Sequence, residues 1–182
     1  MARNDARVRY TKHVLKESLL TLLQDKPVNR ITVKEVCQMA QLNRATFYAH
    51  YSDCFDLKDS IEQELVDAFE DALDRLDSPD VGALIQAIYN MIRTHEKACR
   101  VLVFGSSGTT VTARMTALAR PAAMELWRKH FPKAAESELE MLYTHLSNGL
   151  LQVVVDGYDR YSREDVVRFV RKIVQASLTP FA

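Results

Sequence analysis

Two short helices, each with capping residues at its start, follow one another closely near the amino terminus. Thr32 and Glu35 have the spacing of a capping box, in which each side chain satisfies a backbone N–H group of the other residue. Asn43 is a favourable N-cap for the next helix. Since only about three residues separate the two helices, the spacing is typical of a helix-turn-helix.

The rest of the chain is also predicted to be helical. The 182 residues contain five glycines and five prolines, which is little material for turns. Apolar residues recur at helical spacing through most of the sequence. The expected helices cover about 8–24, 53–77, 79–92, 96–104, 110–131, 136–158 and 163–178, with Ser78 and Pro79 starting the third of these. The predicted fold class is all-α.

Several classes of protein are disfavoured by composition. The longest apolar run has four residues, Val101–Phe104, so neither a membrane span nor a secretory signal is predicted, and we expect a cytoplasmic protein. Three cysteines at wide spacing favour neither a disulfide framework nor a metal site. His95 and Cys99 could share a metal but have no third ligand. We predict no cofactor, no metal and no enzyme activity, because no nucleophile, base and orienting group stand together.

The zero net charge conceals two regions of opposite sign. Residues 1–52 hold nine lysines and arginines against four acidic residues, a net charge of +5, and residues 53–182 carry −5. The most acidic stretch, 53–77, has ten carboxylates and two cations. A basic amino-terminal region favours binding to a polyanion, although a chance scatter of surface charge is the alternative.

The second of the two short helices has an outer face suited to the DNA major groove. Phe47 and Tyr51 lie on the side expected to pack inward, whereas Ala45 and Ala49 lie nearly opposite. Small side chains permit close approach, and the flanking Arg44, Thr46 and Tyr48 offer hydrogen-bonding groups. An ordinary helix with a solvated polar face is the alternative interpretation.

The segments Ile31-Thr32-Val33-Lys34-Glu35-Val36 and Ala40-Gln41-Leu42-Asn43-Arg44-Ala45-Thr46-Phe47-Tyr48-Ala49-His50-Tyr51 closely resemble the DNA-binding signature of the TetR/AcrR family of transcriptional regulators. The resemblance covers about residues 7–57. It implies a homodimeric, all-helical regulator, most simply a repressor, in which three amino-terminal helices bind a palindromic double-stranded DNA operator. A small-molecule effector, of unknown identity, would release it.

The resemblance also assigns DNA contacts to individual residues. The predicted set is Thr32, Lys34, Asn43, Arg44, Ala45, Thr46, Tyr48 and His50. Arg44, Ala45 and Tyr48 occupy the positions that the family uses toward bases, and Thr32, Thr46 and His50 occupy phosphate-binding positions. Two residues depart from the family pattern: Gln41 replaces the usual glycine of the turn, and Cys54 replaces a lysine that would meet phosphate, with Lys58 one turn later as a partial substitute.

We predict a DNA-binding domain over 1–52 and an effector-binding and dimerisation domain over 53–182, with helix 53–77 connecting them. The helix near 136–158 is apolar on more than one side, which favours packing on a second subunit as well as on its own core. A monomeric core helix is the alternative. Candidate residues for an effector pocket are Tyr89, His95, Phe104, Met115, Trp127 and Tyr143. A regulator of the same fold that binds a protein partner instead of DNA is the competing function.

Overall fold

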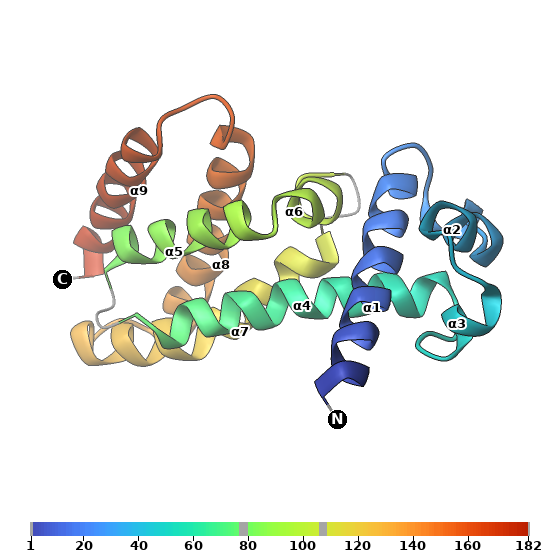
Figure 1. The fold of residues 1–182 in the computed structure, drawn as a ribbon. Coiled ribbons are helices and arrows are strands. Elements are labelled where there is room, and N and C mark those ends of the chain that lie inside the picture. Colours follow the sequence, from blue (N-terminus) through green and yellow to red (C-terminus); the bar gives the residue numbers. More distant parts are fainter. Residues whose placement is uncertain (1, 77–79, 106–108, 182) are drawn as a thin grey trace. The chain divides into compact units, whose positions relative to one another are not determined.

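The computed structural model describes residues 2–76, 80–105 and 109–181 (Figure 1). All of the regular structure in these residues is helical, so the predicted all-α fold is confirmed. Packing divides the chain into two compact units, Met1–Leu65 and Val66–Ala182, and the division falls inside the fourth α-helix.

The first unit begins with α1, Ala2–Leu23, followed by a 3₁₀ turn, η1, at Val28–Arg30. The helix-turn-helix consists of α2, Val33–Ala40, and α3, Arg44–Tyr48. The next helix, α4, covers Cys54–Asp74. The helix α1 begins six residues before residue 8, where the sequence predicted its start. The residues before Val8 are mostly polar and show no apolar periodicity, so the sequence pattern did not identify them as helical.

The core of the first unit is built by residues from all four helices. The side chains of Leu15, Leu19, Val36, Phe47 and Leu57 are fully shielded from solvent. The helix α1 packs on α2, and α2 packs on α3. The short α3 is therefore held by tertiary contacts rather than by its own length, since a single isolated helical turn is unstable in water.

The described residues of the second unit form five further α-helices and a terminal 3₁₀ turn. Their bounds are α5, Val81–Thr94; α6, Glu96–Leu102; α7, Thr109–His130; α8, Glu136–Gly157; α9, Arg163–Leu178; and η2, Thr179–Phe181. The predicted helix start at Ser78 and Pro79 lies outside the described residues, and the described N-cap of α5 is Asp80. Within this unit α5 packs on α9, and α8 packs on both α7 and α9.

An ion pair fastens α5 to α9 at the start of α5. The carboxylate of Asp80 accepts a hydrogen bond from the backbone N–H of Ala83 at 3.1 Å and one from the Arg171 guanidinium at 2.6 Å. A Cβ atom on Gly82 would lie 2.3 Å from that guanidinium. Glycine at position 82 therefore makes room for the arginine to reach across to Asp80.

The turn between α2 and α3 contains a left-handed residue, Gln41, with φ 54° and ψ 38°. Among the described residues it alone combines positive φ with a side chain. Its backbone N–H is directed at the Cys37 and Gln38 carbonyl groups, which helix ends leave without intrahelical partners. The turn has the geometry usual for a helix that ends in glycine. In glutamine this conformation brings the Cβ atom too close to the backbone, which costs free energy.

Gln41→Gly is expected to raise the free energy of unfolding by about 1 kcal/mol, because glycine adopts the left-handed conformation without strain. Urea denaturation followed by circular dichroism at fixed protein concentration measures the change. The control is Gln41→Ala, which keeps the Cβ atom and should stay within about 0.5 kcal/mol of the parent. Equal stabilisation by both substitutions, or none by glycine, would contradict the strain at this position.

Candidate nucleic-acid interface

The start of α2 is closed by the predicted capping box. The Thr32 hydroxyl accepts a hydrogen bond from the Glu35 backbone N–H at 3.3 Å, and the Glu35 carboxylate accepts one from the Thr32 backbone N–H at 2.9 Å. The Thr32 hydroxyl also donates to this carboxylate at 2.8 Å. The Lys26 ammonium lies 2.5 Å from the other carboxylate oxygen, an ion pair that sequence analysis did not identify. Thr32 and Lys34 are both exposed.

This network holds Glu35 in its charged form. The hydrogen bond from Lys26, followed by those from Thr32, lowers the pKa of Glu35 to about 2. The carboxylate therefore remains ionised at the helix N-terminus, where negative charge is favourable. Because Lys26 neutralises this carboxylate, the pair adds no net negative charge beside the predicted phosphate position.

The start of α3 is capped by Asn43, as predicted. The Asn43 side-chain oxygen accepts hydrogen bonds from the Thr46 backbone N–H at 2.7 Å and from the Thr46 hydroxyl at 3.0 Å. Two residues assigned to DNA contacts are therefore engaged with each other. The Thr46 hydroxyl proton is committed to the cap, so Thr46 keeps only acceptor capacity toward other groups.

The opposite faces of α3 differ in burial in the way that the sequence predicted. Phe47 is fully buried, and Tyr51, just beyond the helix, is 5% exposed. On the outer side Arg44, Ala45 and Ala49 are all exposed. Tyr48 is 57% exposed, and its ring lies edge-on to Phe47 with the centroids 5.6 Å apart. The outer surface of α3 thus combines two small side chains with a guanidinium and a phenol.

His50 follows α3 and is half-buried. Its ring lies 6.4 Å from that of Tyr51, measured between centroids. This placement leaves part of the imidazole accessible at the edge of the outer surface.

The beginning of α4 offers less positive charge than the family pattern implies. Cys54 is 4% exposed, and burial raises the pKa of its thiol to about 11, so it belongs to the core. Lys58, the expected substitute, forms an ion pair with Glu62. The Glu62 side chain is 4% exposed and that of Lys58 is 16% exposed. Since an unpaired buried carboxylate is costly, this pair holds Lys58 back from a phosphate contact.

Four of the predicted effector-pocket residues take part in two groups of ring contacts in the second unit. Trp127 and Tyr143 pack edge-on between α7 and α8, with ring centroids 6.0 Å apart. The Tyr143 hydroxyl donates a hydrogen bond to the Thr116 carbonyl group. Met115, the residue before Thr116 on α7, is buried.

Tyr89 and Phe104 instead lie against Tyr158, with centroids 5.3 Å and 5.6 Å from its ring. His95 stands at the junction of α5 and α6 and is half-buried.

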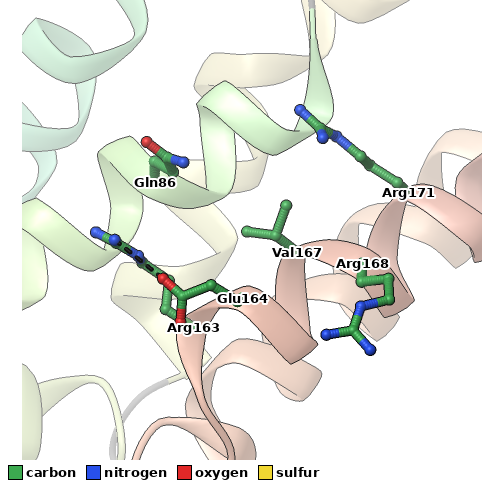
Figure 2. Close-up of a pocket in the computed structure, with 6 residues that line it drawn as sticks. All are labelled: Gln86, Arg163, Glu164, Val167, Arg168 and Arg171. Atoms are coloured by element: carbon green, nitrogen blue, oxygen red, sulfur yellow. Dashed lines mark hydrogen bonds and ion pairs between the residues drawn. The ribbon is translucent and has the colours of Figure 1, made fainter.

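A cleft in the second unit was not predicted. It lies between α5 and the first half of α9 and is lined by Gln86, Arg163, Glu164, Val167, Arg168 and Arg171 (Figure 2). The spacing of Arg163, Val167 and Arg171 at four-residue intervals places them on one side of α9. This periodicity was available in the sequence, but Gln86 could be added only by knowing which helix packs there.

The described residues contain neither a metal-binding cluster nor a membrane-spanning helix. No group of three or more histidine, cysteine, aspartate or glutamate side chains is arranged there to hold a metal ion. None of the helices in residues 2–76, 80–105 and 109–181 is both long and apolar enough to cross a membrane.

Sequence comparisons give a partial match. No protein-family model matches the chain. It is 36% identical over 63 residues to the uncharacterised HTH-type transcriptional regulator YxbF of Bacillus subtilis (strain 168). That match covers 30% of this chain, and the chain spans only 17% of the length of YxbF.

Comparison with solved structures covers nearly the whole chain. A proposed transcriptional regulator from Pseudomonas aeruginosa PAO1 matches with a TM-score of 0.64 and 15% identity, over 94% of this chain and 93% of its own. A TetR/AcrR family regulator from Aquifex aeolicus VF5 matches with a TM-score of 0.61 and 18% identity, over 91% of this chain and 98% of its own. These similarities show that the chain has the all-α fold of TetR/AcrR regulators, as the helix-turn-helix residues predicted.

The low pKa of Glu35 has a consequence for stability. Because the folded pKa of about 2 lies below the ordinary value of 4.5, its contribution is complete above pH 4.5 and disappears as the pH falls toward 2. Glu35→Gln should therefore lower the Tm at neutral pH, and the difference from the parent should shrink at about pH 3. Thermal denaturation of both proteins across this range tests it. A difference that stays constant with pH would contradict the assigned ion pair.

Proposed function

We propose that this protein is a transcriptional regulator that binds a palindromic DNA operator as a homodimer through α2 and α3. In the proposal it acts as a repressor in the cytoplasm and is released by a small-molecule effector. Residues 1–52 form the DNA-binding domain and 53–182 the effector-binding and dimerisation domain. No residue is assigned a catalytic role, and the proteins that share the fold are described as regulators.

The observation that carries the proposal is the outer face of α3. The burial of Phe47 leaves Ala45, Tyr48 and Ala49 exposed. A helix must come close to base edges to read them, and two alanines remove the steric obstacle. Arg44 then has the guanidinium geometry for guanine O6 and N7, and the Ala45 methyl group suits a thymine methyl.

The distribution of charge also favours contact between DNA and the helix-turn-helix. Lys34 at the start of α2 and Arg44 at the start of α3 are both exposed in a region of net charge +5. Phosphate contacts supply much of the affinity of DNA-binding proteins. The acidic stretch 53–77 would be repelled by phosphate, so residues 1–52 are the part of the chain suited to the duplex.

Effector release would act through the spacing of two recognition helices. Two half-sites on one face of DNA are about 34–36 Å apart, so a dimer that changes this separation loses simultaneous docking. We assign the link between effector domain and DNA-binding domain to α4, the helix that continues from one compact unit into the other. The effector would favour the state that cannot bind both half-sites.

A regulator that acts through a protein partner is the second candidate. Cys54 is buried and Lys58 is paired, so the start of α4 presents no cation from either residue. The first unit also exposes large apolar side chains, with Met39 45% and Phe55 50% exposed. Apolar groups of this kind are enriched at protein interfaces.

The two candidates differ in their binding to DNA. The regulator should bind the intergenic duplex upstream of its own gene, with affinity that falls steeply as salt rises, because bound counterions are released. Fluorescence anisotropy with a salt series measures this affinity.

Tyr48→Ala should leave the fold intact and reduce the preference for the operator over unrelated DNA by about 10-fold or more. Lys133→Ala, an exposed position between α7 and α8 in the second unit, is the control. Absence of DNA binding at low salt would favour the protein partner, and an unchanged preference would refute the role of Tyr48.

The surface of α8 and α9 favours a dimer. Five apolar side chains of α8 are only half-buried: Leu142, Leu150, Leu151, Val153 and Val155. Met141 on α8 is 65% exposed and Phe169 on α9 is 48% exposed. Apart from the backbone of its own helix and its two chain neighbours, no described atom lies within 4 Å of the position of a Cβ atom on Gly149, so another helix could approach closely there. We assign these helices to the contact with the second subunit.

Light scattering should therefore give a mass twice the 20.8 kDa of one chain. Replacing Met141 and Phe169 together by aspartate should shift the protein toward monomer, since each charge would be buried in the interface. Tyr10→Asp, which removes an exposed aromatic ring from the first unit, should leave the dimer unchanged. A parent protein that is monomeric at every concentration would contradict the assignment.

A further inference from the structure

The cleft between α5 and α9 has the size of a small-molecule site. Its volume is about 350 Å³, near the lower end of the range found for ligand pockets. Three of its six lining side chains are arginines and one is a carboxylate. Figure 2 shows Arg163 with Glu164 at one end, Arg171 at the other and Val167 between them.

The three arginines differ in how firmly they are held. Arg171 is bound to Asp80 at 2.6 Å, and this contact also fastens α5 to α9. Arg168 is bound to Asp165 at 2.8 Å, one turn away on the same helix. Arg163 contacts Glu164, its neighbour in sequence, at 3.2 Å, with both side chains well exposed. Adjacent residues on a helix do not face each other, so this pair is the weakest of the three and the easiest to exchange.

A buried hydroxyl group without a partner is found on α5, one turn beyond Gln86. The Tyr89 hydroxyl oxygen is buried, and no described group forms a hydrogen bond with it. Tyr89 follows the cleft residue Gln86 by three positions on α5, so the two side chains share one side of that helix. Burial raises the pKa of Tyr89, so the phenol keeps its proton and can act as a hydrogen-bond donor.

We propose that this cleft binds the carboxylate of a small organic acid. The carboxylate takes the place of Glu164 on the Arg163 guanidinium, and the movement of Glu164 opens the way to the Tyr89 hydroxyl. The Gln86 amide and the Tyr89 hydroxyl then donate hydrogen bonds to the ligand. If the proposed function holds, this acid is the effector; the binding itself does not depend on that role.

The chemistry of the donors favours a carboxylate. A guanidinium presents two parallel N–H groups that match the two oxygens of a planar carboxylate, and it remains charged at all accessible pH values. A buried hydroxyl without an acceptor gains a partner when a carboxylate oxygen arrives. The site also lies at the first turn of α9, where the helix dipole favours negative charge.

The test is calorimetric titration of the full-length protein with benzoate, with benzamide as the neutral analogue of equal shape. Benzoate is expected to bind once per chain, and benzamide about 10-fold more weakly or not at all. Arg163→Gln should weaken benzoate binding by about 10-fold or more, and Tyr89→Phe by about 3-fold or more. Lys172→Gln removes one exposed positive charge from the same helix outside the cleft and should leave the affinity within about 2-fold of the parent.

The proposal is overturned if benzoate shows no saturable binding, if benzamide binds equally well, or if Arg163→Gln binds benzoate as the parent does. Circular dichroism should show that both variants are folded, since neither substitution removes a core side chain. These titrations contain no DNA. Loss of operator binding in the anisotropy experiment would therefore count against the proposed function alone, and loss of benzoate binding against the cleft alone.

Discussion

The burial of Phe47 is the contact on which the amino-terminal unit depends. The helix that carries it, α3, has five residues and cannot sustain itself as an isolated helix. With the Phe47 ring fully shielded, rotation of α3 about its axis would expose a large apolar side chain to water, at a free-energy cost of about 1.5–3 kcal/mol. This orientation in turn directs Ala45, Tyr48 and Ala49 outward. An inward contact thus determines which side chains are available for recognition.

Helix capping engages three side chains that the resemblance assigned to DNA contacts. Thr32, Asn43 and Thr46 were assigned to DNA, yet each satisfies a backbone or side-chain group of its own helix start. Such local hydrogen bonds define where α2 and α3 begin and so position Lys34 and Arg44. In the proposal, the direct contacts with DNA are therefore made mainly by the long cationic and aromatic side chains, which take no part in capping and remain exposed.

The second unit uses arginine in two ways. Arg171 joins α9 to the N-cap of α5, and its guanidinium occupies the space that a Cβ atom at Gly82 would take. Arg163, two turns earlier on the same helix, has a weaker contact with Glu164. The firm pair keeps the two helices together, and the weak pair leaves a charged group free to exchange partners. The proposed ligand site thus lies on a wall that another ion pair already stabilises.

The sequence alone determined the features that depend on neighbours within one or two helical turns. The capping residues Thr32, Glu35 and Asn43, the inward side of Phe47 and the helical class followed from spacing, because caps and helix faces are local. Tertiary structure decided the burial of Cys54, the burial of the Glu62 carboxylate that pairs with Lys58, and the contacts of Trp127 with Tyr143 and of Tyr89 with Tyr158. It also joined Gln86 to an arginine stripe nearly eighty residues later in the chain. These outcomes depend on which helices pack together, and helical periodicity gives the apolar face of a helix but not the identity of its partner.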